Sequence, residues 1–368
     1  MTLEVLDQPV KKTALNIAHR NLGAKLVPFG GYEMPVFYPD GIQSEYFAVR
    51  KEVGLFDVSH MGEFCISGNA AEAFLQCMTI NNVAKLKVGE AQYSAMCYPD
   101  GGIVDDLILY RKPDGYFMVV NAANINKDFD WLSQNMMKNV NLENVSDSYS
   151  LIALQGPESR DILNQFIDVD LNMPFYSYHD GLVNGCSVMV SRTGYTGELG
   201  FEIYGDADLL VHIWDLLINA GVKPAGLAAR DILRMEMKYC LYGNDINAFT
   251  NPIEAGLSWI TDLSKDSFVG KEPLLDVKEN GIERQLVAFT MEERGIPRQG
   301  YEVFVGSQKV GVVTSGTQSP ILQKGIGLAY VEYPFHQLGQ EIFISIRKQF
   351  IPARIINPPF IKDTSLHH

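Results

Sequence analysis

Two acidic residues stand inside an otherwise apolar run of this chain. Residues 103–110 (IVDDLILY) follow a turn signal, PDGG, at 99–102, and another β-type run covers residues 93–96. This pattern predicts a β-hairpin whose returning strand carries Asp105 and Asp106. Because side chains alternate across a strand, the two carboxylates are expected to point to opposite faces.

One of these carboxylates is expected in solvent and the other beneath the sheet. A buried carboxylate is costly unless it meets hydrogen-bond donors or a cationic ligand. Two explanations stay open for this segment taken alone. Either a salt bridge joins the strands, or the inward aspartate belongs to a functional site.

The rest of the pattern predicts an α+β protein with an all-β module at its end. A helix capped by Thr13 is expected to end near Gly23, and a loop rich in glycine, proline and aromatic residues follows at 28–35. Further elements are expected at 53–144 (short strands and a helix at 70–77), 150–154, 185–191 and 200–204 (strands), 207–220 and 226–236 (helices), and 284–356 (short strands).

Length and composition limit the class of protein. A chain of 368 residues is expected to form roughly two or three domains. Its net charge of -14 argues against nucleic-acid binding and against an anionic membrane surface, since both need a basic footprint. Residues 1–5 (MTLEV) lack the pattern of a signal peptide, and no apolar window is long enough to cross a bilayer. A cytoplasmic protein without membrane contact is therefore expected.

The cysteines and histidines do not indicate a metal site. The five cysteines are scattered and contain no CxxC pair, and the histidines show no ligand spacing with them. Structural thiols and no bound metal are expected. His367 and His368, at the very end, are set aside as a tag-like sequence.

Two polar motifs remain as candidates for binding. The segment 191–203 (SRTGYTGELGFEI) fits neither a Rossmann fingerprint nor a P-loop; a turn explains its glycines but not Glu202 in an apolar strand. In the helix at 226–236, Arg230 and Arg234 share a face. Ion pairing with Asp231 or Glu236 and bidentate binding of a ligand carboxylate both remain open.

Several motifs together resemble the glycine cleavage T-protein family of aminomethyltransferases. They are GGYEMP at 30–35, LFDVSHM at 55–61, GGIVDDL at 101–107, ALQGP at 153–157, GYTGE at 194–198, LYGND at 241–245 and TSG at 314–316. The resemblance runs nearly end to end. Tyr32 is a mild departure, because many members have tryptophan at this position.

The resemblance implies a three-domain cloverleaf that binds tetrahydrofolate in a central cavity. Residues 1–50 and 147–272 would form a discontinuous folate-binding α+β domain with ferredoxin-like elements and antiparallel sheets. Residues 51–146 would form the second α+β domain, which carries the GGIVDDL hairpin, and residues 280–368 a β-barrel or jelly-roll-like domain. The folate-binding positions would be Met61, Tyr93, Asp106, Asn121, Tyr195, Glu202 and Arg230, with Asp106 as the catalytic residue.

The implied reaction uses tetrahydrofolate as co-substrate and a lipoylated H-protein as partner. An aminomethyl group on the dihydrolipoyl arm would be captured by folate N5, ammonia would leave, and 5,10-methylenetetrahydrofolate would form. Two alternatives are another folate-dependent demethylase of the superfamily and a non-catalytic folate-binding iron-sulfur assembly factor. Lys11, Lys12 and Arg20 are either a docking surface for the carrier or a solvated helix face.

Overall fold

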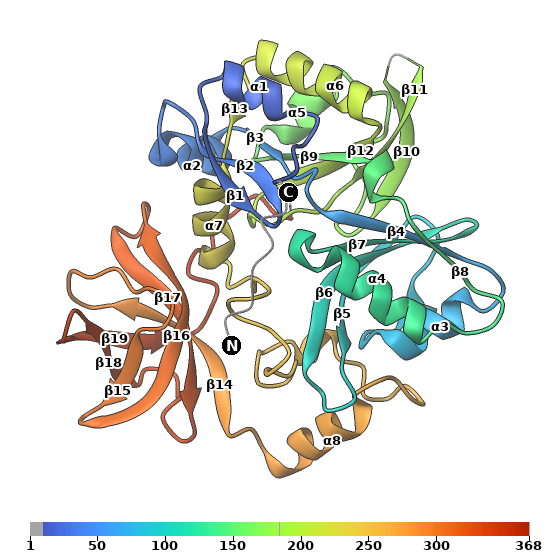
Figure 1. The fold of residues 1–368 in the computed structure, drawn as a ribbon. Coiled ribbons are helices and arrows are strands. Elements are labelled where there is room, and N and C mark those ends of the chain that lie inside the picture. Colours follow the sequence, from blue (N-terminus) through green and yellow to red (C-terminus); the bar gives the residue numbers. More distant parts are fainter. Residues whose placement is uncertain (1–9, 184, 368) are drawn as a thin grey trace.

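Residues 10–183 and 185–367 are described by a computed structural model. Figure 1 shows this part of the chain as three lobes that meet near the middle of the view. Residues 1–5, on which the expectation of no leader rests, lie outside the described residues, as does His368.

The first lobe is built on a sheet that is antiparallel except for its β3–β13 edge. One face is covered by α6 (Ala207–Asn219), whose N-terminus is capped by the Asp206 carboxylate, which accepts the Leu209 N–H at 2.9 Å. In spatial order the strands are β10 (Tyr178–Val183), β11 (Cys186–Ser191), β12 (Gly200–Gly205), β9 (Ser150–Gln155), β3 (Gly54–Asp57) and β13 (Lys223–Pro224).

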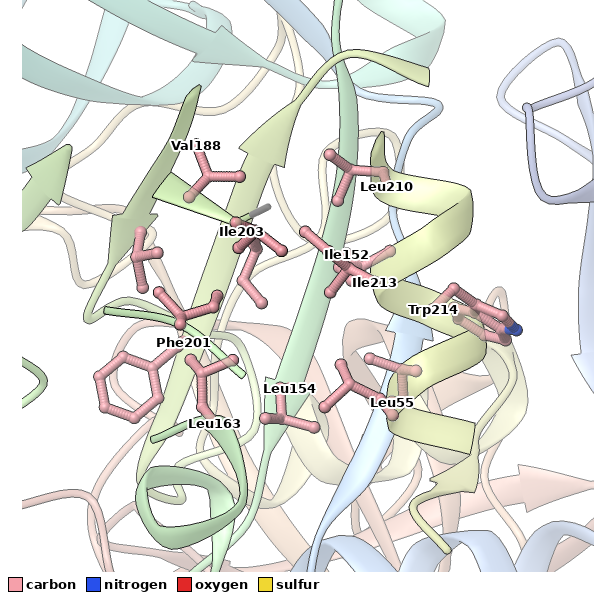
Figure 2. Packing of buried hydrophobic residues seen from close by; sticks show 14 of the residues in the cluster. Leu55, Ile152, Leu154, Leu163, Val188, Phe201, Ile203, Leu210, Ile213 and Trp214 are labelled. Atoms are coloured by element: carbon pink, nitrogen blue, oxygen red, sulfur yellow. The ribbon is translucent and has the colours of Figure 1, made fainter. Parts of the chain in front are cut away.

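The main core of this lobe lies between α6 and the sheet. Figure 2 shows Ile213 of the helix beside Ile152 of β9, and both are buried, as is Trp214 of the same helix. Removing such a side chain from water stabilises the fold by about 1.5–3 kcal/mol. Phe201 and Ile203 of β12 point into the same core, so alternation turns Glu202 to the opposite face of the sheet.

The second lobe contains the predicted hairpin, which the structure confirms. Strands β5 (Ala91–Cys97) and β6 (Ile103–Lys112) pair in antiparallel register, with Tyr93 opposite Ile108 and Ala95 opposite Asp106. Helices α3 (Ala71–Met78) and α4 (Ile125–Gln134) contribute to the core of this lobe. In spatial order the strands are β5 (Ala91–Cys97), β6 (Ile103–Lys112), β7 (Gly115–Val120), β4 (Gly62–Ser67) and β8 (Asn141–Asn144).

The third lobe is a closed antiparallel barrel, so the expected α+β fold with a C-terminal barrel is confirmed. Apolar residues from its strands fill the interior. Because the sheet closes on itself, the barrel has no open sheet edge. Around the barrel the strands are β14 (Arg284–Met291), β17 (Lys324–Glu332), β16 (Gln308–Ser319), β15 (Glu302–Val305), β18 (Glu341–Ile346) and β19 (Gln349–Ile356).

A buried ion network joins the first lobe to the barrel. Arg50 of α2 (Ile42–Lys51) contacts Glu198 at 2.7 Å and Glu236 at 2.6 Å. Ser319 of the barrel donates to Glu236 at 2.6 Å. Ser365, in the segment after the barrel, donates its N–H to Glu198 at 2.8 Å. Glu198, in the GYTGE motif, therefore has a structural position between lobes.

The N-terminal predictions need correction. The helix is α1 (Asn16–Asn21), and Thr13 does not cap it, because its hydroxyl donates to Asp57 at 2.7 Å. The stretch expected as a loop is a hairpin of β1 (Lys25–Phe29) and β2 (Tyr32–Phe37). Gly30 and Gly31 have φ of 56° and 85°, as a type I′ turn requires, so this glycine pair closes a hairpin.

One strand lies outside the lobe in which it was expected. Strand β3, inside the range 51–146 expected for the second domain, pairs with β9 in the first lobe. The elements not yet given are α5 (Ser159–Leu163), α7 (Leu227–Glu236), α8 (Lys271–Asn280) and the 3₁₀ helices Val83–Lys85, Ala122–Asn124, Ser146–Ser148 and Ser258–Ile260.

Candidate active site

Asp106 lies on the hairpin face opposite the helices of the second lobe. The hydroxyl of Tyr93, on the neighbouring strand, donates to Asp106 Oδ2 at 2.8 Å. The two residues are diagonal neighbours in the β5–β6 register, so their side chains share a face. The structure thus brings two of the expected site residues together.

Asn121 connects Asp106 to Asp105 on the other face. Its side-chain amide donates to Asp106 Oδ1 at 2.8 Å and to Asp105 Oδ1 at 2.9 Å. Its backbone N–H donates to Asp105 Oδ2 at 3.1 Å. The position of Asn121, directly after β7, allows one residue to reach both carboxylates.

The expectation that one aspartate lies in solvent is wrong. Asp105 is 0% exposed, and Asn124 also donates to it at 2.7 Å. Within the described part of the chain, no salt bridge joins it to a neighbouring strand; its N–H donors are amides from the segment after β7. Asp105 therefore holds Asn121 and Asn124 in place, and Asp106 is the aspartate that faces the first lobe.

The pKa of Asp106 is raised from 3.8 to about 7. Burial is the main cause, because it penalises the charged form, and the negative charge of Asp105 adds to it. The hydrogen bonds from Tyr93 and Asn121 oppose the shift. A carboxyl group that titrates near neutral pH can both hold and release a proton under physiological conditions.

Glu202 lies at the end of a group of buried hydroxyls. The Thr193 hydroxyl donates to Glu202, and Ser191 and Tyr110 extend the group, with 3.1 Å between the Tyr110 and Ser191 oxygens. Burial raises the pKa of Glu202, while Thr193 and the charge of Arg230 lower it. Sequence reasoning missed Thr193 and Ser191, although both lie in the motif that contains Glu202.

Arg230 is held over an aromatic ring rather than in an ion pair. Its guanidinium lies 4.7 Å from the centroid of Tyr195, and its Nη1 is buried without a hydrogen-bond partner among the described residues. Burial lowers its pKa, and the charge of Glu202 opposes that shift. An unpaired buried guanidinium nitrogen is the group that a ligand carboxylate would satisfy.

Arg234 forms ion pairs, which was the other alternative expected for this helix. It contacts Asp231 at 2.8 Å and Asp245 at 2.5 Å, and it donates to Ser315 of the barrel at 2.9 Å. Glu236 is bound by Arg50. The two arginines, one turn apart, therefore differ. Arg234 connects the first lobe to the barrel, whereas Nη1 of Arg230 has no hydrogen-bond partner among the described residues.

Asp106 and Glu202 both influence the pKa of a tyrosine that lies between them in sequence. Both carboxylates raise the pKa of Tyr176, after burial as the largest cause. Asp106 also raises the pKa of Tyr195, which Arg230 lowers. Residues from β6, β12 and α7 thus converge electrostatically, although they are widely separated in sequence.

The other predicted residues lie around this group. Met61 follows β3 and packs against the cluster that contains Phe117 and Tyr204. Lys11 and Lys12 are exposed and precede the first helix, so they do not form a helix face. Arg20 is paired with Glu33 and is less available for docking than expected.

Two general features bear on ligands. Among residues 10–183 and 185–367, no group of three or more His, Cys, Asp or Glu side chains is suited to a metal ion. In the same residues, no helix has both the length and the apolar character needed to span a membrane.

The comparisons with known proteins cover almost the whole chain. The family model described as the GCVT N-terminal domain matches residues 15–265, and that of the glycine cleavage T-protein C-terminal barrel domain matches 284–362. The chain is 48% identical to an aminomethyltransferase of Halothermothrix orenii over 96% of this chain and 100% of the relative. It is 50% identical to an aminomethyltransferase of Flavobacterium psychrophilum with the same coverage.

A solved structure agrees in fold. The glycine cleavage system aminomethyltransferase T from Bartonella henselae superposes with a TM-score of 0.91 at 32% identity, covering 96% of this chain and 99% of that one. Two α+β lobes, a closed barrel and a half-buried Tyr-Asp-Asn group define the class as a GCVT-type protein. The chain belongs to the glycine cleavage T-protein family.

Proposed function

We propose that this protein transfers the aminomethyl group of a lipoylated H-protein to tetrahydrofolate, with Asp106 as the catalytic residue. The relatives support an aminomethyltransferase over the demethylase and assembly-factor alternatives. The reaction releases ammonia and forms 5,10-methylenetetrahydrofolate, and it belongs to glycine catabolism and one-carbon metabolism.

The observation that carries the proposal is the environment of Asp106. Its carboxylate receives donors on both oxygens, from Tyr93 and Asn121, and these hold it in one orientation. Its pKa of about 7 lets it accept a proton from folate N5 and stabilise positive charge that develops there. A carboxylate kept in place before the reaction needs no reorganisation during it.

Glu202 and Arg230 fit the two ends of a folate. A reduced pterin presents a donor-rich amide edge, which a buried carboxylate such as Glu202 can bind with hydrogen bonds worth about 1.5–3 kcal/mol each. The anionic glutamyl tail needs a cationic donor, and the unpartnered Nη1 of Arg230 supplies one. Tyr195 holds the guanidinium in place from one side.

Each residue therefore has a separate task. Tetrahydrofolate supplies the nucleophilic nitrogen, and the chain supplies orientation and proton transfer. Tyr93 and Asn121 orient Asp106, Glu202 recognises the pterin, and Arg230 neutralises the tail. Met61 would add an apolar contact beside the pterin, which its place in the cluster near Phe117 and Tyr204 supports.

The cytoplasm is the proposed location. The five cysteines are free thiols, as expected in a reducing compartment. The acidic net charge and the absence of a membrane-spanning helix among the described residues agree with that assignment.

The proposal is tested by turnover with an aminomethyl-loaded lipoyl carrier and tetrahydrofolate. Wild type is compared with Asp106→Asn, and ammonia and methylenetetrahydrofolate are both measured. We expect Asp106→Asn to lose about 100-fold or more in kcat while it still binds tetrahydrofolate in calorimetry. Full turnover by Asp106→Asn would refute the catalytic assignment. If wild type bound folate but showed no turnover, the proposed aminomethyltransferase activity would be refuted.

A further inference from the structure

A second buried carboxyl group lies behind the catalytic aspartate. Asp128, in the first turn of α4, is 0% exposed. No N–H or O–H group among the described residues donates to either of its oxygens. Its strongest interaction with another side chain is with the carboxyl group of Asp105, on the strand that α4 covers, through charge and through a shared hydrogen bond that needs a proton on one of the two groups.

Two carboxyl groups can share a hydrogen bond only if one of them carries a proton. The surroundings decide which one. Asp105 receives three N–H donors, two from Asn121 and one from Asn124, at 2.7–3.1 Å, and such donors stabilise the charged form. Asp128 receives none, so burial favours its neutral form.

The nearest cation does not reverse this assignment. Lys127 Nζ is 3.6 Å from Asp128 Oδ1, which is longer than a hydrogen bond. That ammonium group already donates to Val104 O and, at 3.2 Å, to the Tyr242 hydroxyl, and it lies 4.2 Å from the Tyr242 ring centroid. Its side chain is 33% exposed, so water screens its charge.

We propose that Asp128 is a positioning residue for the transfer reaction: it keeps a proton and donates it to Asp105, so that Asp105 stays an anion held by Asn121 and Asn124. Asn121 in turn holds Asp106, and the charge of Asp105 sets how readily Asp106 takes up a proton. This inference rests on the proposed function, because it assigns Asp128 an effect on the catalytic Asp106.

Burial raises the pKa of both Asp105 and Asp128, but hydrogen bonds from Asp128, Asn121 and Asn124 lower that of Asp105. Burial raises the pKa of Asp128 to about 10, with the charge of Asp105 as the next cause. The titratable and charged groups that act on Asp106 or on the carboxyl pair come from several elements. They are Tyr93 and Tyr98 (β5 and the turn after it), Asp105 (β6), Lys127 (α4), Tyr176, Tyr195, Cys240 and Tyr242.

The decisive variants separate a neutral Asp128 from a charged one. Asp128→Asn has the shape of the acid and, like the protonated acid, is neutral and can donate to Asp105. The fall of its kcat/KM at low pH, the acid limb of the pH profile, should have a midpoint within about 0.3 pH units of that of wild type. Asp105→Asn removes the charge beside Asp106, so its limb should move at least about one unit toward lower pH. Asp128→Ala removes the donor and should lower kcat about tenfold, which Asp128→Asn restores.

A spectroscopic readout makes the test independent of turnover. In infrared difference spectra of the full chain at pH 7, Asp128→Asn should lack one protonated-carboxyl C=O band that wild type and Asp106→Asn both show. An unchanged band pattern, or an acid limb of Asp128→Asn shifted down by one unit or more, would overturn the inference, since both outcomes mean that Asp128 is charged. If wild type showed no turnover, the proposed function would fail, and if Asp106→Asn kept full turnover, the catalytic assignment would fail; in both cases the infrared band would still decide the state of Asp128.

Discussion

The hydroxyl of Tyr93 donates to the carboxylate of Asp106 at 2.8 Å across the β5–β6 hairpin. This bond lowers the pKa of a carboxyl group that burial and Asp105 raise. Groups that oppose one another therefore hold the pKa of the proposed proton acceptor near neutral pH.

The wild-type enzyme should show an acid limb with a midpoint near pH 7. The base role proposed for Asp106 requires its charged form, and its pKa is about 7. Below that value the carboxyl group is protonated, so kcat/KM should fall about tenfold per pH unit. Ammonia release measured from pH 5.5 to 9 checks this. A rate independent of pH from 5.5 to 7.5 would contradict the role of Asp106.

Tyr93→Phe should move this limb toward higher pH. The variant removes a donor that favours the charged form of Asp106, so the pKa of Asp106 rises, by about one unit. Activity should fall several-fold at pH 7 and recover near pH 9. Tyr333→Phe, at an exposed position after β17, is the matched control and should leave the profile unchanged. A uniform loss at every pH would indicate a different role for Tyr93.

Glu202→Gln should weaken tetrahydrofolate binding more than it lowers kcat. The amide keeps the shape of the side chain but loses the charge, and its NH₂ group faces the donors of the pterin. A loss of about 1.5–3 kcal/mol raises KM for tetrahydrofolate about 10- to 150-fold. Glu198→Gln, in the same motif, is the control: it contacts Arg50 and Ser365 and should change stability, with KM nearly unchanged. Equal effects of the two variants on KM would refute the distinction.

Arg50→Met should destabilise the fold by about 3–5 kcal/mol, because it leaves Glu198 and Glu236 buried without a cation. Chemical denaturation at pH 7 measures the free energy of unfolding. Arg354→Met is the control, since this residue pairs with Glu292 on the surface and is 44% exposed; it should cost less than about 1 kcal/mol. Similar losses for both variants would show that the buried network stabilises the fold no more than a surface ion pair does.

Gly30→Ala should impair catalysis more than Gly31→Ala. Both glycines have positive φ, so both variants strain the turn. A methyl group at Gly30 would lie 2.8 Å from Ala122 Cβ, next to Asn121, whereas Gly31 has open space. We expect similar losses in unfolding free energy from backbone strain and an additional fall in kcat for Gly30→Ala. Equal kcat values would show that the hairpin tip does not support Asn121.

The sequence alone determined the hairpin and the opposite orientation of its two aspartates. These depend on local alternation, which the register of Tyr93 and Asp106 follows. Local pattern also determined the helix at 70–77 and the all-β end of the chain, which correspond to α3 and the barrel. The motifs carried enough information to identify the family.

Only the tertiary structure decided what surrounds each carboxylate. The burial of Asp105 and the effect of its charge on the pKa of Asp128 depend on how α4 packs on the sheet, and no local pattern shows that packing. The same holds for Glu198 and Glu202, which lie in one motif but have different partners. Arg50 contacts Glu198, and the Thr193 hydroxyl donates to Glu202. Burial and nearby charge set a pKa, and both are properties of contacts between segments far apart in the chain.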